Sequence, residues 1–156
     1  MSDSKKDVSG AIAPPPVIAL ALIAIGVVLG VIWPVEIIPA PWQYFAGGPI
    51  IAASVLLVMS AFRLFRKAKT PVPPYRTPTA LVTDGVFRIS RNPIYLSLVL
   101  LMICLAVTLD NIYLFALAAV CQQIIRWGVI AREEPFLEAK FGDEYRAFKQ
   151  RTRRWI

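Results

Sequence analysis

Four long apolar runs separated by polar segments dominate the pattern of this chain. They cover residues 17–33, 44–65, 94–109 and 112–131. Each run is close in length to the roughly 20 apolar residues with which an α-helix crosses a bilayer. Prolines flank the first run, where they suit a helix start and stop a helix beyond its end. The pattern predicts an all-α fold, an integral membrane helical bundle with about four transmembrane helices. A cleaved signal peptide is the alternative for the first run, but the residues before it are not clearly basic.

The segments that connect and follow these runs have distinct characters. Only Asp110-Asn111 separates the third run from the fourth, so these two helices are predicted to form a tight antiparallel hairpin. Residues 66–93 form a long loop rich in proline. Within the tail, residues 132–156, a stretch beginning at Pro135 has the spacing of an amphipathic helix. Such a helix is expected to lie on the membrane or to cover a pocket.

Lysine and arginine are distributed unevenly between the connections. The segment from Arg63 to Arg91 holds seven of them against one acidic residue, and the tail after Ala131 holds seven more. The other two connections hold none. By the positive-inside rule, the loop 66–93 and both termini are therefore predicted to be cytosolic. The expected location of this multi-pass protein is a bacterial-type inner membrane.

Composition narrows the range of functions. Hydrophobic residues make up 57% and charged residues 17% of the chain, outside the balance of a soluble domain. Residues 1–13 are predicted to be a flexible tail and 14–156 a single domain. The net charge of +7 does not indicate nucleic-acid binding, because the basic residues flank apolar runs. Histidine is absent and the two cysteines, Cys104 and Cys121, lack metal-ligand spacing. No metal site is predicted, and Ser-His-Asp and Cys-His catalysis are excluded.

Polar residues gather at the start of the third predicted helix. Pro93 suits the first helical turn, and Asn92 is placed to cap it. The N-terminus of a helix favours an anionic group, and Arg88 and Arg91 add positive charge at the same place. These residues predict a site for a carboxylate or a phosphate. The alternative is a well-capped membrane helix with interfacial arginines.

A second polar group marks the end of the fourth predicted helix. Helical spacing places its members on two adjacent stripes, which predicts a polar wedge that faces the interior of the bundle. The alternative is simple hydrogen bonding between helices. The wedge consists of Gln122, Gln123, Arg126, Glu133 and Glu134. The two glutamates suit binding of a cationic amine or a ribose diol, or proton acceptance, and Arg151 suits an anionic group of a substrate.

Together these elements resemble the isoprenylcysteine carboxyl methyltransferase and phospholipid methyltransferase superfamily of membrane enzymes. The superfamily pattern contains Gly-x-Phe/Tyr-Arg, then Arg-His/Asn-Pro-x-Tyr, a hairpin, Glu-Glu and Phe-Gly-x-Glu-Tyr. The corresponding segments here are Gly85-Val86-Phe87-Arg88, Arg91-Asn92-Pro93-Ile94-Tyr95, Glu133-Glu134 and Phe141-Gly142-Asp143-Glu144-Tyr145. Each segment is weakly specific alone, but their order in a membrane setting is fairly specific.

The resemblance implies an S-adenosylmethionine-dependent methyltransferase, similar to the isoprenylcysteine carboxyl methyltransferases. It would methylate a lipophilic or membrane-delivered acceptor, at a carboxylate, a thiol or a lipid amine, on the cytosolic face of the bilayer. The cofactor-binding residues that it implies are Arg91, Asn92, Pro93, Tyr95, Leu96, Glu133 and Glu134. The candidate catalytic residues are Glu134, Tyr145 and Arg151.

Two positions depart from the superfamily pattern. Asn92 replaces the histidine of the eukaryotic enzymes, and Ser97, which would narrow the cofactor channel, stands where many relatives have glycine. Two other functions fit the sequence less well. One is an NADPH-dependent membrane reductase, because sterol reductases share a similar C-terminal half. The other is a non-enzymatic four-helix scaffold or accessory subunit whose polar wedge only joins helices. The sequence leaves the acceptor and the oligomeric state open.

Overall fold

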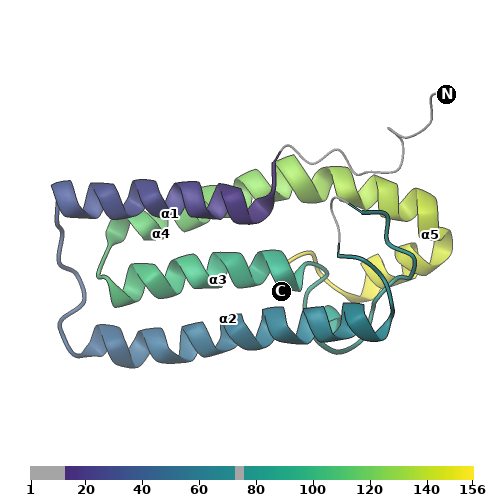
Figure 1. The fold of residues 1–156 in the computed structure, drawn as a ribbon, viewed down its shortest axis with the longest axis horizontal. Helices are drawn as coiled ribbons and strands as arrows, with labels where there is room; N and C mark the ends of the chain where they lie inside the picture. The colour runs from purple at the N-terminus through teal and green to yellow at the C-terminus, as the bar shows by residue number, and fades with distance from the viewer. Residues whose placement is uncertain (1–12, 73–75) are drawn as a thin grey trace.

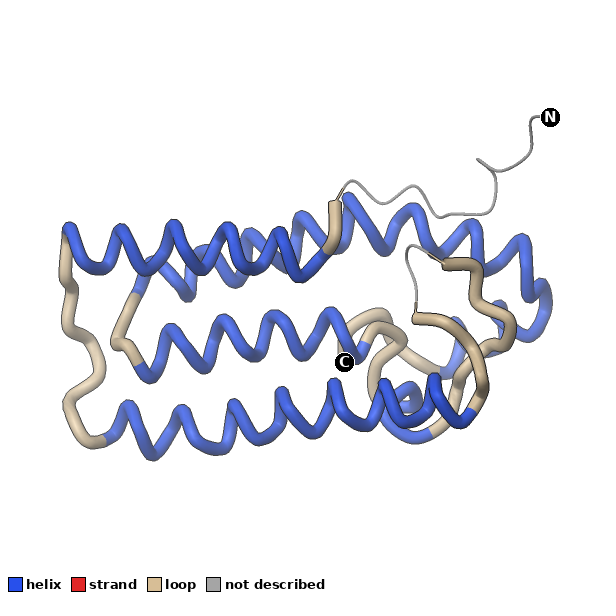
Figure 2. The backbone as a smooth tube through the Cα atoms, in the orientation of Figure 1, coloured by secondary structure: helices blue, strands red, loops and turns tan. Residues whose placement is uncertain are grey.

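The computed structural model describes residues 13–72 and 76–156, and this part of the chain is all-helical (Figures 1 and 2). Its elements are α1 (Pro15–Ile32), α2 (Trp42–Lys67), a 3₁₀ turn η1 (Gly85–Arg88), α3 (Pro93–Thr108), α4 (Ile112–Ile125), a π-helical turn η2 (Arg126–Ile130) and α5 (Ala131–Arg151). Three helical segments in the described part are long and apolar enough to cross a membrane, and α3 is a shorter apolar helix. The predicted all-α membrane bundle is confirmed. The predicted tail, residues 1–13, lies outside the described residues except for Ala13.

The helix α3 occupies the centre of the bundle (Figure 1). It packs against α2 and α4, and α1 packs mainly on α4. Buried residues occur along the whole of α3, whereas α1 and α2 bury few and present apolar side chains outward, as lipid-facing helices do. The predicted antiparallel hairpin is confirmed, since α3 ends at Thr108 and α4 begins at Ile112.

Two glycines of α1 allow a close approach to α4. A Cβ atom on Gly26 would collide with the Leu114 side chain, and one on Gly30 with the Asn111 side chain. Asn111 caps α4 by accepting a hydrogen bond from the Leu114 N–H at 3.1 Å, and its amide donates to the Gly26 carbonyl at 2.9 Å. One buried polar side chain therefore both starts α4 and fixes α1 against it.

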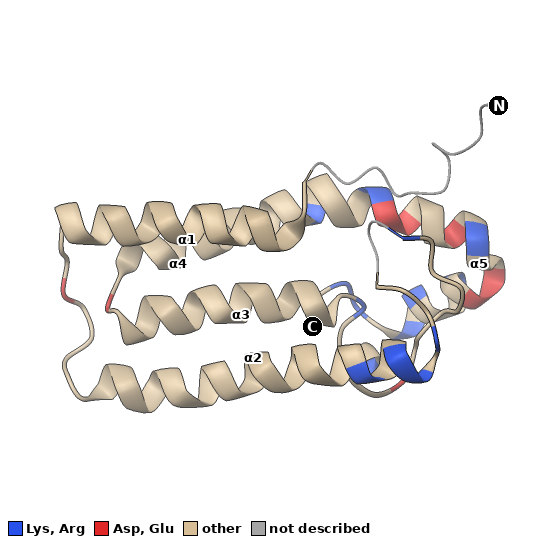
Figure 3. Ribbon diagram, in the orientation of Figure 1, with Lys and Arg blue, Asp and Glu red and all other residues tan. Residues whose placement is uncertain are grey.

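Charged residues are concentrated at one end of the bundle, which we call the charged end (Figure 3). It includes the end of α2, the loop before α3 and all of α5. At the opposite end Asp110 accepts hydrogen bonds from the backbone N–H groups of Ile37 and Ile38 at 2.9 and 3.0 Å. This carboxylate thereby fastens the connection between α1 and α2 to the hairpin turn.

A π-helical turn joins α4 to α5, so the helix that starts at Ile112 is continuous. This helix has 40 residues. Its straight part, from Ile112 to a kink at Gly142, is about 45 Å long at 1.5 Å per residue, roughly one and a half times the thickness of a bilayer core. The charged residues of α5 distinguish it from the apolar first part of this helix, and they lie at the charged end (Figure 3). The fourth predicted helix, Ile112 to Ala131, corresponds to α4 and the π turn, and the chain continues from there as a helix into α5.

The π turn also changes which residues share a face of the helix. Its ring is wider than that of an α-helix, and a shift of one residue rotates the following side chains by about 100°. Glu133 and Glu134 are buried, whereas Gln123 is exposed on the outer surface. The prediction of a continuous polar wedge is therefore wrong for Gln123, because the periodicity that places it beside Glu134 is interrupted.

The second half of α5 folds back over the start of α3 (Figure 1). The helix kinks at Gly142, whose φ of 55° and ψ of −125° are not helical. After the kink, Tyr145 and Phe148 are buried in an apolar cluster with Phe65 of α2 and Phe87 of η1. The predicted amphipathic helix therefore exists, and it covers the charged end instead of lying flat beside the bundle.

Gly142→Ala is expected to lower the free energy of unfolding by about 1–2 kcal/mol, because a Cβ atom is disfavoured at positive φ. The cost comes from the backbone alone, since no described residue from elsewhere in the chain has an atom within 4 Å of the position of that Cβ. Gly48→Ala in α2 is the control, because its Cβ also meets open space and its φ is not positive. Denaturant unfolding in detergent micelles measures both. Equal stability of Gly142→Ala and wild type would contradict the kink.

Candidate active site

A small cavity lies at the charged end, between the start of α3, the start of α5 and the folded-back half of α5. Its volume is about 70 Å³. Residues of the loop before α3 complete its wall. The polar and titratable residues that line it are Arg91, Asn92, Tyr95, Glu133, Glu134 and Tyr145. The apolar lining includes Phe65, Leu81, Phe87, Leu137, Phe141 and Phe148.

Tyr95 and Glu133 connect α3 to α5 through one buried hydrogen bond. The Tyr95 hydroxyl donates to Oε1 of Glu133 at 2.7 Å, and the Glu133 residue is only 4% exposed. Burial raises the pKa of Glu133 to about 7; the Tyr95 hydrogen bond opposes this and the nearby Glu134 carboxylate adds to it. Glu133 is therefore a carboxyl group that gains or loses a proton near neutral pH, as a general acid or base must.

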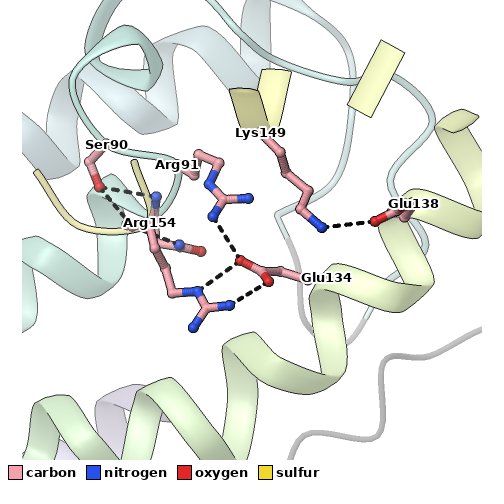
Figure 4. A network of polar contacts seen from close by, with 7 residues as sticks. Ser90, Arg91, Glu134, Glu138, Lys149 and Arg154 are labelled. Carbon is pink, nitrogen blue, oxygen red and sulfur yellow. Dashed lines mark hydrogen bonds and ion pairs between the residues drawn. The ribbon is translucent and has the colours of Figure 1, made fainter. Parts of the chain in front are cut away.

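Glu134 lies between two arginines that come from different parts of the chain (Figure 4). Arg154 approaches with two nitrogens: Nε donates to Oε1 at 2.9 Å and Nη2 to Oε2 at 2.6 Å. Nη2 of Arg91 lies 3.2 Å from the same Oε1. The hydrogen bond from Arg154 to Glu134 raises the pKa of the Arg154 guanidinium. The three groups form one charged network on the wall of the cavity.

Arg91 is held by this network at only one of its nitrogens. Its side chain is 10% exposed, and its Nε and Nη1 atoms are buried with no hydrogen-bond partner among the described residues. Buried donors without partners are rare, because each one loses its hydrogen bonds to water without replacement. Since Arg91 lines the cavity, these two nitrogens are candidate donors to a ligand bound there.

The segment after α5 crosses the start of α3 and closes one side of the site. The backbone N–H of Arg91 donates to the Arg153 carbonyl at 3.0 Å. The amide of Asn92 donates to the Arg154 carbonyl at 2.9 Å. The prediction that Asn92 caps α3 is therefore wrong, because its side chain makes no cap hydrogen bond and instead holds this following segment.

Most of the chain matches a known protein family. A family model described as phospholipid methyltransferase matches residues 42–144, well over half of the chain. The chain belongs to this family. The resemblance inferred from the sequence is confirmed, because the phospholipid methyltransferases are part of the same membrane methyltransferase superfamily. Membership implies a membrane methyltransferase, and together with the apolar helices it supports an integral membrane protein.

A relative of unknown activity adds a second similarity. An uncharacterized protein of Haemophilus influenzae is 44% identical over 62 residues, which are 40% of this chain and 98% of that protein. No solved structure matches this chain. The matched family region contains Arg91, Tyr95, Glu133 and Glu134 but ends before Tyr145 and Arg154.

The structure brings together all but two of the predicted site residues around the cavity. Arg91, Asn92, Pro93, Tyr95, Glu133, Glu134 and Tyr145 line the cavity. Leu96 is buried but does not line it, and Arg151 is exposed and lines a separate hollow with Asp84 and Arg88. Ser97 does not line it either; its carbonyl accepts a hydrogen bond from Ser54 of α2 at 2.8 Å.

Burial determines the protonation state of Tyr145. It raises the pKa of this hydroxyl to about 12, and the neighbouring Glu134 carboxylate acts in the same direction. The phenol therefore stays neutral at physiological pH. Tyr145 can take part in hydrogen bonding and can shape the cavity, but it does not serve as a proton acceptor.

Sequence reasoning missed Arg154, which contacts Glu134 directly. The two positions Arg151 and Arg154 are three residues apart, so continued helical spacing would place them on the same side. The helix ends at Arg151, and Thr152 is extended with φ −129° and ψ 132°. This change of conformation turns Arg154 toward Glu134. The signal in the sequence was only a short basic stretch before Trp155, which is also typical of a membrane-surface anchor.

Proposed function

We propose that this protein is an S-adenosylmethionine-dependent methyltransferase that acts on a lipophilic acceptor at the cytosolic face of the membrane. The observation that carries the proposal is that Nε and Nη1 of Arg91 are buried without a hydrogen-bond partner among the described residues, beside two glutamates in the cavity. The cofactor carries a carboxylate, an ammonium group, a ribose diol and an aromatic base. Arg91 suits the carboxylate, Glu134 suits the ammonium or the diol, and the aromatic wall suits the base.

The charges and aromatic groups of the lining residues suit S-adenosylmethionine, but the cavity is too small to hold it. Small-molecule sites usually enclose about 300–1,000 Å³. The present cavity encloses about 70 Å³. Binding therefore requires the covering half of α5, which carries Tyr145 and Phe148, to move outward. Its kink at Gly142 is the natural hinge, because glycine tolerates a wide range of backbone conformations.

When bound, S-adenosylmethionine supplies an electrophilic methyl group on a sulfonium. A carboxylate or thiolate acceptor needs no general base, and for these the protein contributes positioning and exclusion of water. An amine acceptor has to lose a proton. Oε1 or Oε2 of Glu133 can hold that proton, because its pKa of about 7 matches the working pH.

The surroundings of the site favour an acceptor that comes from the bilayer. Apolar side chains form most of the described cavity wall, and the outer surfaces of α1 and of α2 up to its basic last turns are apolar. The excess of lysine and arginine at the charged end supports a cytosolic location of that end, and with it of both termini. The acceptor would then meet the cofactor at the cytosolic membrane surface.

Addition of S-adenosylmethionine to the purified protein in detergent is expected to raise its unfolding temperature. A ligand at 100 times its Kd stabilises the folded state by about 2.7 kcal/mol. Arg91→Ala is expected to abolish this rise. Arg88→Ala is the matched control, because Arg88 is exposed and pairs with Asp84 away from the cavity. A wild-type protein that does not respond at high concentration would contradict the proposal, and a response to NADPH instead would favour a reductase.

A further inference from the structure

The segment that follows α5, residues 152–156, forms a strap across the site, and it lies outside the matched family region. Its backbone is fixed to residues 90–92 by three contacts. These are the hydrogen bonds from Arg91 N–H to the Arg153 carbonyl at 3.0 Å, from the Asn92 amide to the Arg154 carbonyl at 2.9 Å and from the Ser90 hydroxyl to the Arg154 carbonyl at 3.4 Å. Trp155 packs against the apolar core formed by α1, α3 and α4. The strap therefore presents Arg154 at a fixed place (Figure 4).

The contacts of Arg154 determine which acceptor positions of the Glu134 carboxylate are occupied. A carboxylate has about four acceptor positions on its two oxygens. Oε1 of Glu134 accepts from Arg154 Nε and contacts Arg91 Nη2, and Oε2 accepts from Arg154 Nη2. Three positions are thus used, and the remaining one is on Oε2. Arg154 holds the carboxylate in the orientation that leaves this position available.

The same arrangement keeps Arg91 available. A lone arginine and carboxylate prefer a two-pronged pairing, with two parallel N–H···O contacts. Arg154 occupies that pairing with Glu134, so Arg91 makes only one contact to it. Nε and Nη1 of Arg91 consequently have no hydrogen-bond partner in the part of the chain that the structure describes, although the guanidinium also acts on the neighbouring Tyr145 hydroxyl. Without Arg154, Arg91 would be the only arginine beside Glu134 and would turn its second nitrogen to it.

From this geometry we infer that Arg154 is a positioning residue: it occupies Glu134 in a two-pronged pair and thereby leaves the donors of Arg91 and one acceptor position of Glu134 to the methyl donor. The inference rests on the proposed function, since it concerns how the same site recognises its ligand. Arg154 itself does not line the cavity, so it acts through Glu134 and Arg91 and not by touching the ligand.

The test compares the affinity of the full-length protein for S-adenosylmethionine in Arg154→Ala, Arg154→Lys and Arg153→Ala. Arg153 is the matched control, because its exposed side chain is adjacent and only its carbonyl is used in the strap. Titration calorimetry in detergent gives the Kd, and the unfolding temperature is recorded with and without ligand. We expect Arg154→Ala to weaken binding at least tenfold, Arg154→Lys to weaken it less because it keeps a single charged contact, and Arg153→Ala to bind like wild type.

The two readouts separate positioning from a structural role. A purely structural role would lower the unfolding temperature of ligand-free Arg154→Ala and leave the Kd unchanged, which overturns the inference. Should Arg154→Ala fail to fold, the Kd of Arg154→Lys decides: a value equal to that of wild type overturns the inference, and a weaker one supports it. If S-adenosylmethionine binds wild type and Arg154→Ala equally, only this inference fails. If it does not bind wild type at all, the proposed function and the inference fail together.

Discussion

Glu134→Gln is expected to lower the free energy of unfolding by about 3 kcal/mol, because loss of one partner leaves buried charge uncompensated. Two arginines depend on this carboxylate. Their side chains are 10% exposed for Arg91 and 28% for Arg154, and that of Glu134 is 12% exposed. The amide of glutamine keeps the shape of the side chain but not its charge. Denaturant unfolding in detergent at neutral pH measures the loss.

The matched control for this variant is Glu138→Gln on the same helix. Glu138 pairs with Lys149 at 2.9 Å across the kink of α5, but both side chains are about one-third exposed. An ion pair in such a position contributes about 1 kcal/mol or less, since water and salt screen it. Equal effects of the two variants would show that the network around Glu134 is as weak as a surface pair, which contradicts the burial that we describe.

Glu133→Gln is expected to change the pH dependence of stability. The folded-state pKa of Glu133, about 7, lies above its ordinary value of 4.5 because burial disfavours the charged form. A raised pKa contributes stability that is fully present below pH 4.5 and is lost as the pH rises through about 7. The difference between these values corresponds to roughly 3 kcal/mol. Relative to wild type, the variant should therefore gain up to this amount between acidic and slightly alkaline pH.

The measurement is a series of unfolding experiments on both proteins from acidic to alkaline pH in one detergent. Groups that titrate equally in both proteins cancel in the difference, so the remaining trend belongs to Glu133. Glu144→Gln serves as the control for loss of a carboxylate from α5, because Glu144 is exposed. A difference that does not vary with pH would show that Glu133 titrates in the folded protein as it does in the unfolded chain.

The sequence allowed the site to be located because two simple constraints act together. A two-residue turn forces the third and fourth apolar helices to be antiparallel neighbours, and charge places their polar ends on one side. Arg91 and Tyr95 must therefore lie near Glu133 and Glu134, and the structure places them around one cavity. These features are easy to recognise in the sequence because helix length, turn length and charge distribution each depend on many residues.

The contacts inside the site depend on features that leave little trace in the sequence. No residue type marks the π turn at 126–130, although it rotates Glu133 and Glu134 relative to Gln123. The assignment of partners, Tyr95 to Glu133 and Arg154 to Glu134, depends on tertiary packing and on a strap that leaves the helix after Arg151. Periodicity arguments apply only while one helix continues, so they fail at these places.

The shortness of α3 has a consequence for the depth of the cavity. With 16 residues, α3 is about 24 Å long, less than the roughly 30 Å of a bilayer core. Contacts from Ser54 to Ser97 and from Cys104 to Gly47 align it with α2, which continues to Lys67 past the level of Pro93. The floor of the cavity, at the start of α3, is thus recessed from the end of α2 toward the middle of the bundle. If the charged end lies at the membrane surface, as the proposed function requires, a lipid acceptor would reach this floor by lateral diffusion in the bilayer, whereas water would have to pass below the lipid headgroups.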